Sequence, residues 1–125
     1  MQGASGKRFN KIKGDYGEAL AIGYLRERGY KIVETNYKNR LGEIDIIAKK
    51  NKVLHFIEVK YRRTTEFGHG RDSVGYNKQL RIKNAANLYL TSTKLMFRVN
   101  SCFDIIEIHE TNTGTAIEHL VNCFQ

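Results

Sequence analysis

Charged residues in two short apolar segments have the types and spacing to do chemistry together. Glu43 and Asp45 are two positions apart in an isoleucine-rich run. Glu58 and Lys60 are two positions apart in the next apolar run. Residues two positions apart lie on the same face of a β-strand, so each pair is expected to point one way.

The pairing of the two runs decides whether the acids meet. With an even number of residues in the turn, Ala48 pairs with Val53. This register sets Asp45 opposite Phe56 and makes it a same-face diagonal neighbour of Glu58, roughly 7–8 Å away. Two carboxylates beside a lysine suit Mg²⁺ and a phosphate, because oxygen atoms ligate the ion and an ammonium neutralises charge. Surface ion pairs on the open face of an antiparallel sheet would give the same pattern.

Glu18 is a third candidate acid. It is in line with Ile22 and Leu25 at helical spacing, on the apolar stripe that should face the sheet. Asp15 followed three residues later by Glu18 is also the pattern of an N-terminal capping box. Both roles could hold together.

Lys78 lies on the apolar stripe of a second expected helix, in line with Ile82, Ala85 and Tyr89. From there its ammonium could reach the charged patch of the sheet. Long basic side chains also extend from such positions to solvent, so either arrangement fits the spacing.

The periodicity of apolar residues predicts the elements that must position these side chains. The order is αβββαββ, which indicates an α/β domain with a mixed sheet flanked by two long helices. Residues 1–13 are predicted to form a flexible basic arm, and residues 14–125 a single domain. The expected helices span 15–28 and 76–90; the expected strands span 30–37, 42–48, 53–61, 97–108 and 116–124, with a loop at 64–73.

The charge is strongly positive and unevenly placed. The chain of 125 residues has 21 Lys+Arg and 13 Asp+Glu, a net charge of +8. The basic excess is concentrated in the middle of the chain, which is the expected footprint of a protein that neutralises phosphates. A solvated lysine-rich surface would look similar. The residues expected to follow a nucleic-acid backbone are Arg62, Arg63, Arg71, Lys78 and Arg81.

Several protein classes are excluded by composition. No run approaches the ~20 apolar residues of a membrane span, and no signal peptide is visible, so we expect a cytoplasmic protein with no membrane partner.

Cys102 and Cys123 show no metal-ligand or disulfide spacing and are expected to be small core residues. His55 is expected to be a packed or surface histidine, and Asp104 a partner of a buried basic group.

The candidate residues together resemble a known superfamily. Asp45 followed by the run 58–60 (Glu-Val-Lys), after a helical Glu18, looks like the PD-(D/E)xK nucleases with their restriction-endonuclease-like core (αβββαβ). More closely, the chain resembles the YraN family of endonuclease-like bacterial proteins from about Gly14 to Phe124. The segments that carry this likeness are 17–19, 24–25, 29–30, Asn36, 42–45, 56–60, Lys78 and 103–104.

The resemblance implies a divalent-metal-dependent nuclease that hydrolyses phosphodiester bonds. Asp45 and Glu58 would ligate Mg²⁺ or Mn²⁺, and the carbonyl of Val59 could add a ligand. Lys60 would position the hydrolytic water. DNA is favoured over RNA as the partner, with branched or single-stranded DNA among the candidates, and the protein could act as a homodimer.

Two further residues receive roles from the same resemblance. Glu18 would supply another acid, and Lys78 would contact the scissile phosphate. The sequence departs from the family pattern at Cys102, where a basic residue is common, and at Lys38, where arginine is usual. A different class of function also fits: a nucleic-acid-binding module that keeps the nuclease fold and does not cut.

Overall fold

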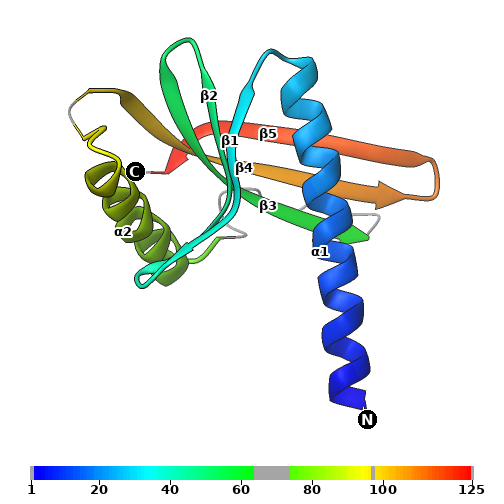
Figure 1. Cartoon of the computed structure of the whole chain (residues 1–125). Coiled ribbons are helices and arrows are strands. Elements are labelled where there is room, and N and C mark those ends of the chain that lie inside the picture. The colour runs from blue at the N-terminus through cyan, green and yellow to red at the C-terminus, as the bar shows by residue number, and fades with distance from the viewer. Residues whose placement is uncertain (1, 64–73, 97, 125) are drawn as a thin grey trace.

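A five-stranded sheet with a helix on each face forms the structure (Figure 1). The computed structural model describes residues 2–63, 74–96 and 98–124. Within this part of the chain the element order αβββαββ is confirmed. The elements are α1 (Gln2–Glu27), β1 (Lys31–Asn39), β2 (Gly42–Lys50), β3 (Val53–Arg63), α2 (Tyr76–Ser92), β4 (Asn100–Thr111) and β5 (Gly114–Phe124).

The sheet is mixed, as predicted. Its strands lie in the order β1-β2-β3-β4-β5, and β3 pairs with β4 in parallel while the other neighbours are antiparallel. A parallel pair needs a long connection between its strands, and α2 lies in that connection. The first three strands therefore form the predicted meander.

Two hydrophobic cores lie on opposite faces of the sheet. Successive strand residues point to opposite faces, and Phe56 and Ile57 accordingly belong to different cores. The Phe56 core contains Ile82 and Tyr89 of α2, and the Ile57 core contains Leu25 of α1. Each helix thus covers one face (Figure 1).

The first helix begins earlier than the sequence pattern indicates. We expected it near Asp15, after a flexible arm over residues 1–13, but α1 starts at Gln2. The chain contains no proline, and its basic N-terminal residues are compatible with a helix. Asp15 therefore lies inside α1, and the capping-box interpretation of Glu18 is wrong. Of the two described helices only α1 is long, with 26 residues against 17 in α2.

The predicted end of α1 at Gly29 is confirmed. Gly29 has a φ of +86°, the left-handed conformation that a glycine adopts at little cost. The N–H of Tyr30 donates to the carbonyl of Leu25 at 3.0 Å, and the N–H of Gly29 to that of Arg26 at 3.1 Å. These two bonds form a Schellman motif, which satisfies the last carbonyls of the helix.

The register that we expected between β2 and β3 is wrong by two residues. Lys50, rather than Ala48, pairs with Val53, and Phe56 lies opposite Ile47. The turn contains only residues 51 and 52, which have φ angles of 52° and 67°, as in the tight turns that suit hairpins. A shift of two residues preserves which face each side chain occupies, so the predicted faces survive.

The expected loop at 64–73, including Arg71, lies outside the described residues. The predicted strand 97–108 starts later, since β4 begins at Asn100.

Neither described helix has the length and apolar content needed to cross a lipid bilayer.

Gly17 sets the close approach of α1 to β3. A Cβ at this position would lie 2.8 Å from the Cβ of Tyr61, whereas a Cβ at Gly23 would meet nothing within 4 Å. We predict that Gly17→Ala lowers the free energy of unfolding by about 1–3 kcal/mol through overpacking. The matched control Gly23→Ala should raise it by roughly 0.5–1 kcal/mol, because alanine favours a helix.

Urea denaturation followed by circular dichroism measures both changes. Equal effects of the two substitutions would contradict the close packing of α1 on β3.

Candidate functional site

The hairpin of β2 and β3 brings Asp45 and Glu58 together. Its ladder runs as far as the pair Ile46 and Ile57, and the next residue on each strand is one of the two acids. There the carboxylate of Asp45 accepts a hydrogen bond from the backbone N–H of Val59 at 2.8 Å. The acids are thus closer in register than the diagonal placement expected from the sequence.

Glu58 affects the charge of Asp45. Burial, and then the negative charge of Glu58, raise the pKa of Asp45 from 3.8 to about 7, although the hydrogen bond from Val59 acts the other way. Glu58 itself is only 5% exposed. Two carboxylates in this position repel each other, and a nearby cation relieves that repulsion.

Lys78 and Lys60 supply the positive charge beside these acids. The Nζ atom of Lys78 lies 2.6 Å from Oε1 of Glu58, and the Nζ atom of Lys60 lies 3.9 Å from the same oxygen. Burial lowers the pKa of Lys60, and the charge of Lys78 lowers it further. Burial also disfavours the charge of Lys78, but the hydrogen bond and charge of Glu58 outweigh it and raise the pKa of Lys78.

Glu18 of α1 stands at the edge of the same group. Burial, Asp15 and Glu58 raise the pKa of Glu18, and a hydrogen bond with the side chain of Asn36 lowers it. Asn36 has a φ of 51°, a left-handed conformation that asparagine tolerates better than most residues. Asn36 belongs to the residues that carry the family resemblance, and the structure links it to Glu18.

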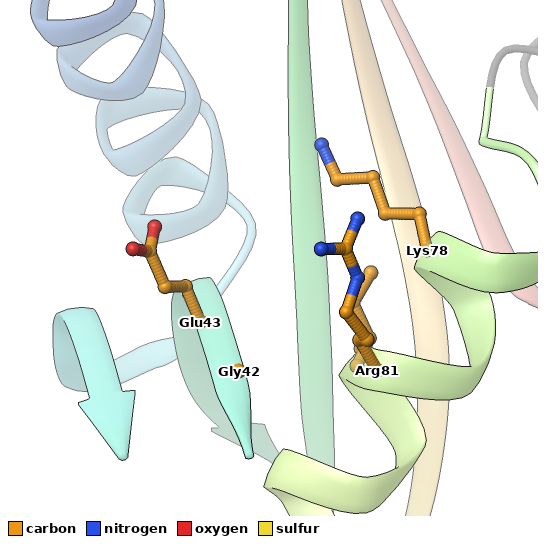
Figure 2. A pocket seen from close by; sticks show the side chains of 5 residues that line it. Gly42, Glu43, Lys78 and Arg81 are labelled. Carbon is orange, nitrogen blue, oxygen red and sulfur yellow. The ribbon is translucent and has the colours of Figure 1, made fainter. Parts of the chain in front are cut away.

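A groove of about 370 Å³ opens beside Lys78, between α2 and the start of β2. Figure 2 shows Lys78 and Arg81 extending from α2, with Glu43 across from them on β2. Glu43 forms an exposed ion pair with Lys38 at 3.1 Å. The groove is lined by Gly42, Glu43, Lys78, Arg81 and Ile82.

The expected backbone-binding residues do not all gather at this groove. Lys78 and Arg81 line the groove. Arg62 and Arg63 are the last two residues of β3 and are not among the lining residues. Strand alternation places Arg62 on the face of Glu58 and Lys60 and Arg63 on the other face.

Glu107 is a buried acid next to Lys60 that was not predicted from the sequence. Glu107 of β4 pairs in register with Lys60, is 1% exposed, and lies 2.7 Å from the ring nitrogen of His109. Its position follows from the parallel pairing of β3 with β4, which no local spacing reveals. The signal available was an acid in the middle of an isoleucine-rich strand.

The expectations for the cysteines and for Asp104 have different outcomes. Cys102 and Cys123 are both partly exposed, and Cys123 packs against the Phe56 core, so the prediction of small core residues holds in part for Cys123 and is wrong for Cys102. Asp104 is fully buried and contacts His55 and His119, which confirms the predicted basic partners. Parallel pairing sets His55 beside Cys102, and this joins residues that are far apart in the sequence. Burial, and then the charge of Asp104, raise the pKa of Cys102 to about 12.

Comparison with known proteins places the chain in a family. The family model described as "Uncharacterised protein family UPF0102" matches residues 17–108. A UPF0102 protein of Clostridium botulinum (strain Eklund 17B / Type B) is 44% identical over 121 residues, covering 95% of this chain and 98% of the relative. One of Dictyoglomus thermophilum is 44% identical over 117 residues, with 92% and 98% covered. One of Syntrophomonas wolfei is 42% identical over 116 residues, with 93% and 100% covered.

The raised pKa of Asp45 predicts a pH-dependent stability. A carboxyl whose pKa is higher in the folded state stabilises the fold below pH 4, and this contribution is lost as pH rises towards 7. We therefore predict that, without divalent ions, Asp45→Asn gains stability over the parent as the pH rises. The free energy of unfolding of the variant minus that of the parent should be roughly 2–4 kcal/mol larger at pH 8 than at pH 4. Asparagine can still accept the bond from Val59.

Urea denaturation at pH 4 and pH 8 with a chelator present measures this difference. The control Glu34→Gln, an exposed carboxyl on β1, should follow the parent. An Asp45→Asn protein with the parent's pH dependence would contradict the raised pKa of Asp45.

Proposed function

The chain belongs to the family UPF0102, and we propose that it is a divalent-metal-dependent nuclease that hydrolyses phosphodiester bonds of nucleic acid. One observation carries the proposal: the carboxylates of Asp45 and Glu58 lie together with Lys60 and Lys78 next to a basic groove. Residue types that suit metal binding, phosphate binding and proton transfer thus occupy one place.

The order of the elements supports the finer description of the fold. The first six elements follow the order αβββαβ of a restriction-endonuclease-like core, with a mixed sheet between two helices. The acids lie on β2 and β3, where the resemblance to PD-(D/E)xK nucleases expects them. We therefore propose that this core is the scaffold of the site.

The donor atoms suit Mg²⁺ or Mn²⁺. The carboxylates of Asp45 and Glu58 and the carbonyl of Val59 are hard oxygen ligands, which these ions prefer. The raised pKa of Asp45 fits this assignment, because burial and then the charge of Glu58 disfavour its carboxylate, and a bound cation would offset both. When bound, the ion would polarise the phosphoryl group and lower the pKa of a water.

Lys60 and Lys78 differ in the roles that their charges permit. The lowered pKa of Lys60 makes its ammonium a readier proton donor than an ordinary lysine, and its free amine a base that can orient the attacking water. Lys78 keeps its charge, since Glu58 raises its pKa, so it suits a phosphate. Glu18, held by Asn36, adds a further acid at the edge of the site.

The groove beside Lys78 suits the backbone of a nucleic acid. Arg81 brings a guanidinium that can bind a phosphate with two hydrogen bonds, and Arg62 adds positive charge on the same face of the sheet as the acids. We propose DNA as the substrate ahead of RNA, with branched and single-stranded forms to be compared. A homodimer and a cytoplasmic location stay predictions.

A non-cleaving nucleic-acid-binding module is the second candidate function. The contact of Lys78 with Glu58 at 2.6 Å favours it, because this ion pair already neutralises one carboxylate without a metal. Binding of nucleic acid is expected under both functions, so only turnover distinguishes them.

Cleavage of a substrate panel tests the nuclease. We predict turnover with Mg²⁺ or Mn²⁺ on at least one of single-stranded, duplex, flapped or four-way-junction DNA or the matching RNA. Glu58→Gln should reduce the rate by about 100-fold or more, since a charge at the reacting centre is lost. Glu34→Gln, an exposed acid on β1, is the matched control and should cut at the parent's rate.

Cleavage that survives Glu58→Gln would exclude this site as the catalytic centre. Tight binding with no turnover under any divalent ion would replace the nuclease by the binding module.

The position of Arg81 in the groove predicts a role in nucleic-acid binding that can be tested separately from cleavage. Arg81→Ala should weaken DNA binding regardless of sequence and reduce the slope of log K against log salt by about 1, as expected for one lost phosphate contact. Lys49→Ala, which removes an exposed lysine at the other end of β2, is the control and should leave the slope unchanged. Fluorescence anisotropy over a salt series measures the slopes. Equal slopes for Arg81→Ala and the parent would show that nucleic acid does not lie in this groove.

A further inference from the structure

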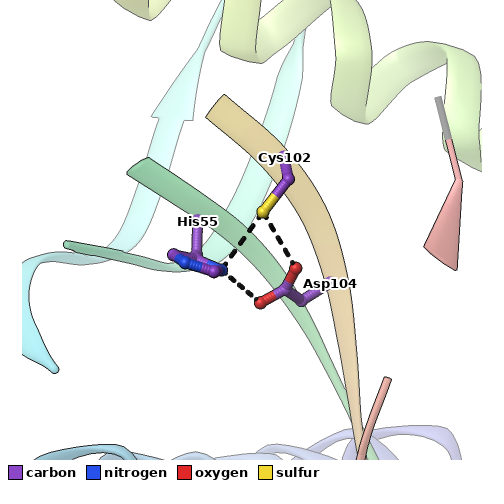
Figure 3. A group of neighbouring side chains, drawn as sticks. All are labelled: His55, Cys102 and Asp104. Carbon is purple, nitrogen blue, oxygen red and sulfur yellow. Dashed lines mark hydrogen bonds and ion pairs between the residues drawn. The ribbon is translucent and has the colours of Figure 1, made fainter. Parts of the chain in front are cut away.

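A second group of metal-ligating side chains lies on the opposite face of the sheet from the carboxylates of the proposed nuclease site. Figure 3 shows His55 of β3 facing Cys102 and Asp104 of β4. His55 and Cys102 are partners in the parallel ladder, and Asp104 follows two residues along on the same face. Their ligand atoms all lie within 4.8 Å of one another.

The three side chains form a closed triangle of contacts. Nδ1 of His55 lies 2.6 Å from Oδ2 of Asp104 and 3.2 Å from Sγ of Cys102, and that Sγ lies 3.3 Å from Oδ1 of Asp104. An ionised carboxylate brings no proton, so the thiol and Nδ1–H offer two protons for three contacts. At least one close approach therefore lacks a proton of its own.

We propose that His55, Cys102 and Asp104 form a binding site for a transition-metal ion, with Zn²⁺ as the best match. An imidazole nitrogen, a thiolate and a carboxylate are the ligand types that zinc takes. Zinc ligands at 2.0–2.3 Å stand about 3.3–3.7 Å apart in a tetrahedron, so the three atoms need to move outwards by less than about 1 Å. The soft sulfur and the nitrogen distinguish this site from the all-oxygen set at Asp45 and Glu58.

Residues around the triangle hold the carboxylate in place. Asp104 lies opposite an irregularity in β5, where Asn122 has a φ of 53° and donates its N–H to Oδ1 of Asp104 at 2.9 Å. Nε2 of His119 lies 2.8 Å from Oδ2 of the same residue. Partners of this kind orient a ligating carboxylate and tune its affinity for metal.

The site is enclosed on the α1 side and reachable near Cys102. The ring of Tyr30 packs edge-on against that of His55, with centroids 5.0 Å apart. Asp104 is fully buried and His55 is 7% exposed, whereas Cys102 is partly exposed and gives a path for the ion. Three protein ligands leave a fourth position of the tetrahedron for water.

Binding has a simple chemical balance. A bond forms between Sγ of Cys102 and the ion, and the thiol proton leaves to solvent. His55 offers the lone pair of Nδ1, so its remaining ring proton must sit on Nε2. No oxidant or reductant is required.

Titration of the tag-free, metal-free protein with Co²⁺ tests the site, because a cobalt–thiolate bond gives a charge-transfer band in the near ultraviolet. The parent should show this band and the visible bands of a tetrahedral ion, and an equivalent of Zn²⁺ should remove them. Cys102→Ser should lose the thiolate band and bind Zn²⁺ at least about 100-fold more weakly. Cys123→Ser removes the other partly exposed cysteine and should behave as the parent.

A second variant separates loss of the ligand from loss of the fold. His119→Gln should keep the thiolate band and weaken Zn²⁺ binding by roughly 10–100-fold, as expected for a residue that orients Asp104. Thermal unfolding of all the variants reports folding directly. No thiolate band in the folded parent, or a band that persists in Cys102→Ser, would overturn the proposal.

Discussion

Repulsion between two carboxylates, and the contacts that balance it, is the constraint on which the candidate site depends. Asp45 and Glu58 end the paired part of one hairpin, and burial raises the cost of their charges. The backbone N–H of Val59, the ammonium of Lys78 and the more distant ammonium of Lys60 offset part of this cost. Natural proteins keep such unfavourable groups where function needs them, at the expense of stability.

The packing of both helices follows from the same requirement. α1 must approach β3 closely to bring Glu18 to the acids, and Gly17 permits that approach. α2 must approach the start of β2 to bring Lys78 to Glu58, and there a Cβ at Gly42 would lie 2.9 Å from the carbonyl oxygen of Arg81. Small residues at two helix–sheet contacts thus let charged side chains from three directions converge.

Much of this arrangement could be predicted from the sequence, because strand alternation is a local rule. It placed Asp45 and Glu58 on one face, and the error of two residues in register did not change that. The start of α1 was missed because glycines in a basic segment suggest an arm when no tertiary contact is visible. Glu107 beside Lys60, and Cys102 beside His55, were missed because parallel pairing joins residues more than 40 positions apart.

β3 therefore has different chemistry on its two faces. Glu58 and Lys60 face the oxygen-rich site and the groove, while His55 faces a sulfur- and nitrogen-containing group. Under the two proposals these sets of ligands would select different ions, since hard oxygen donors suit Mg²⁺ and Mn²⁺ and a thiolate suits Zn²⁺. On these proposals one strand would serve two metal sites without exchange of their ions.

The most direct test of the central claim is anomalous diffraction from crystals of the protein soaked in Mn²⁺. The account predicts a manganese peak between the carboxylates of Asp45 and Glu58, within bonding distance of both, and none in crystals of Glu58→Gln. A parent crystal with no peak at the two acids, and with Lys78 still paired to Glu58, would contradict it.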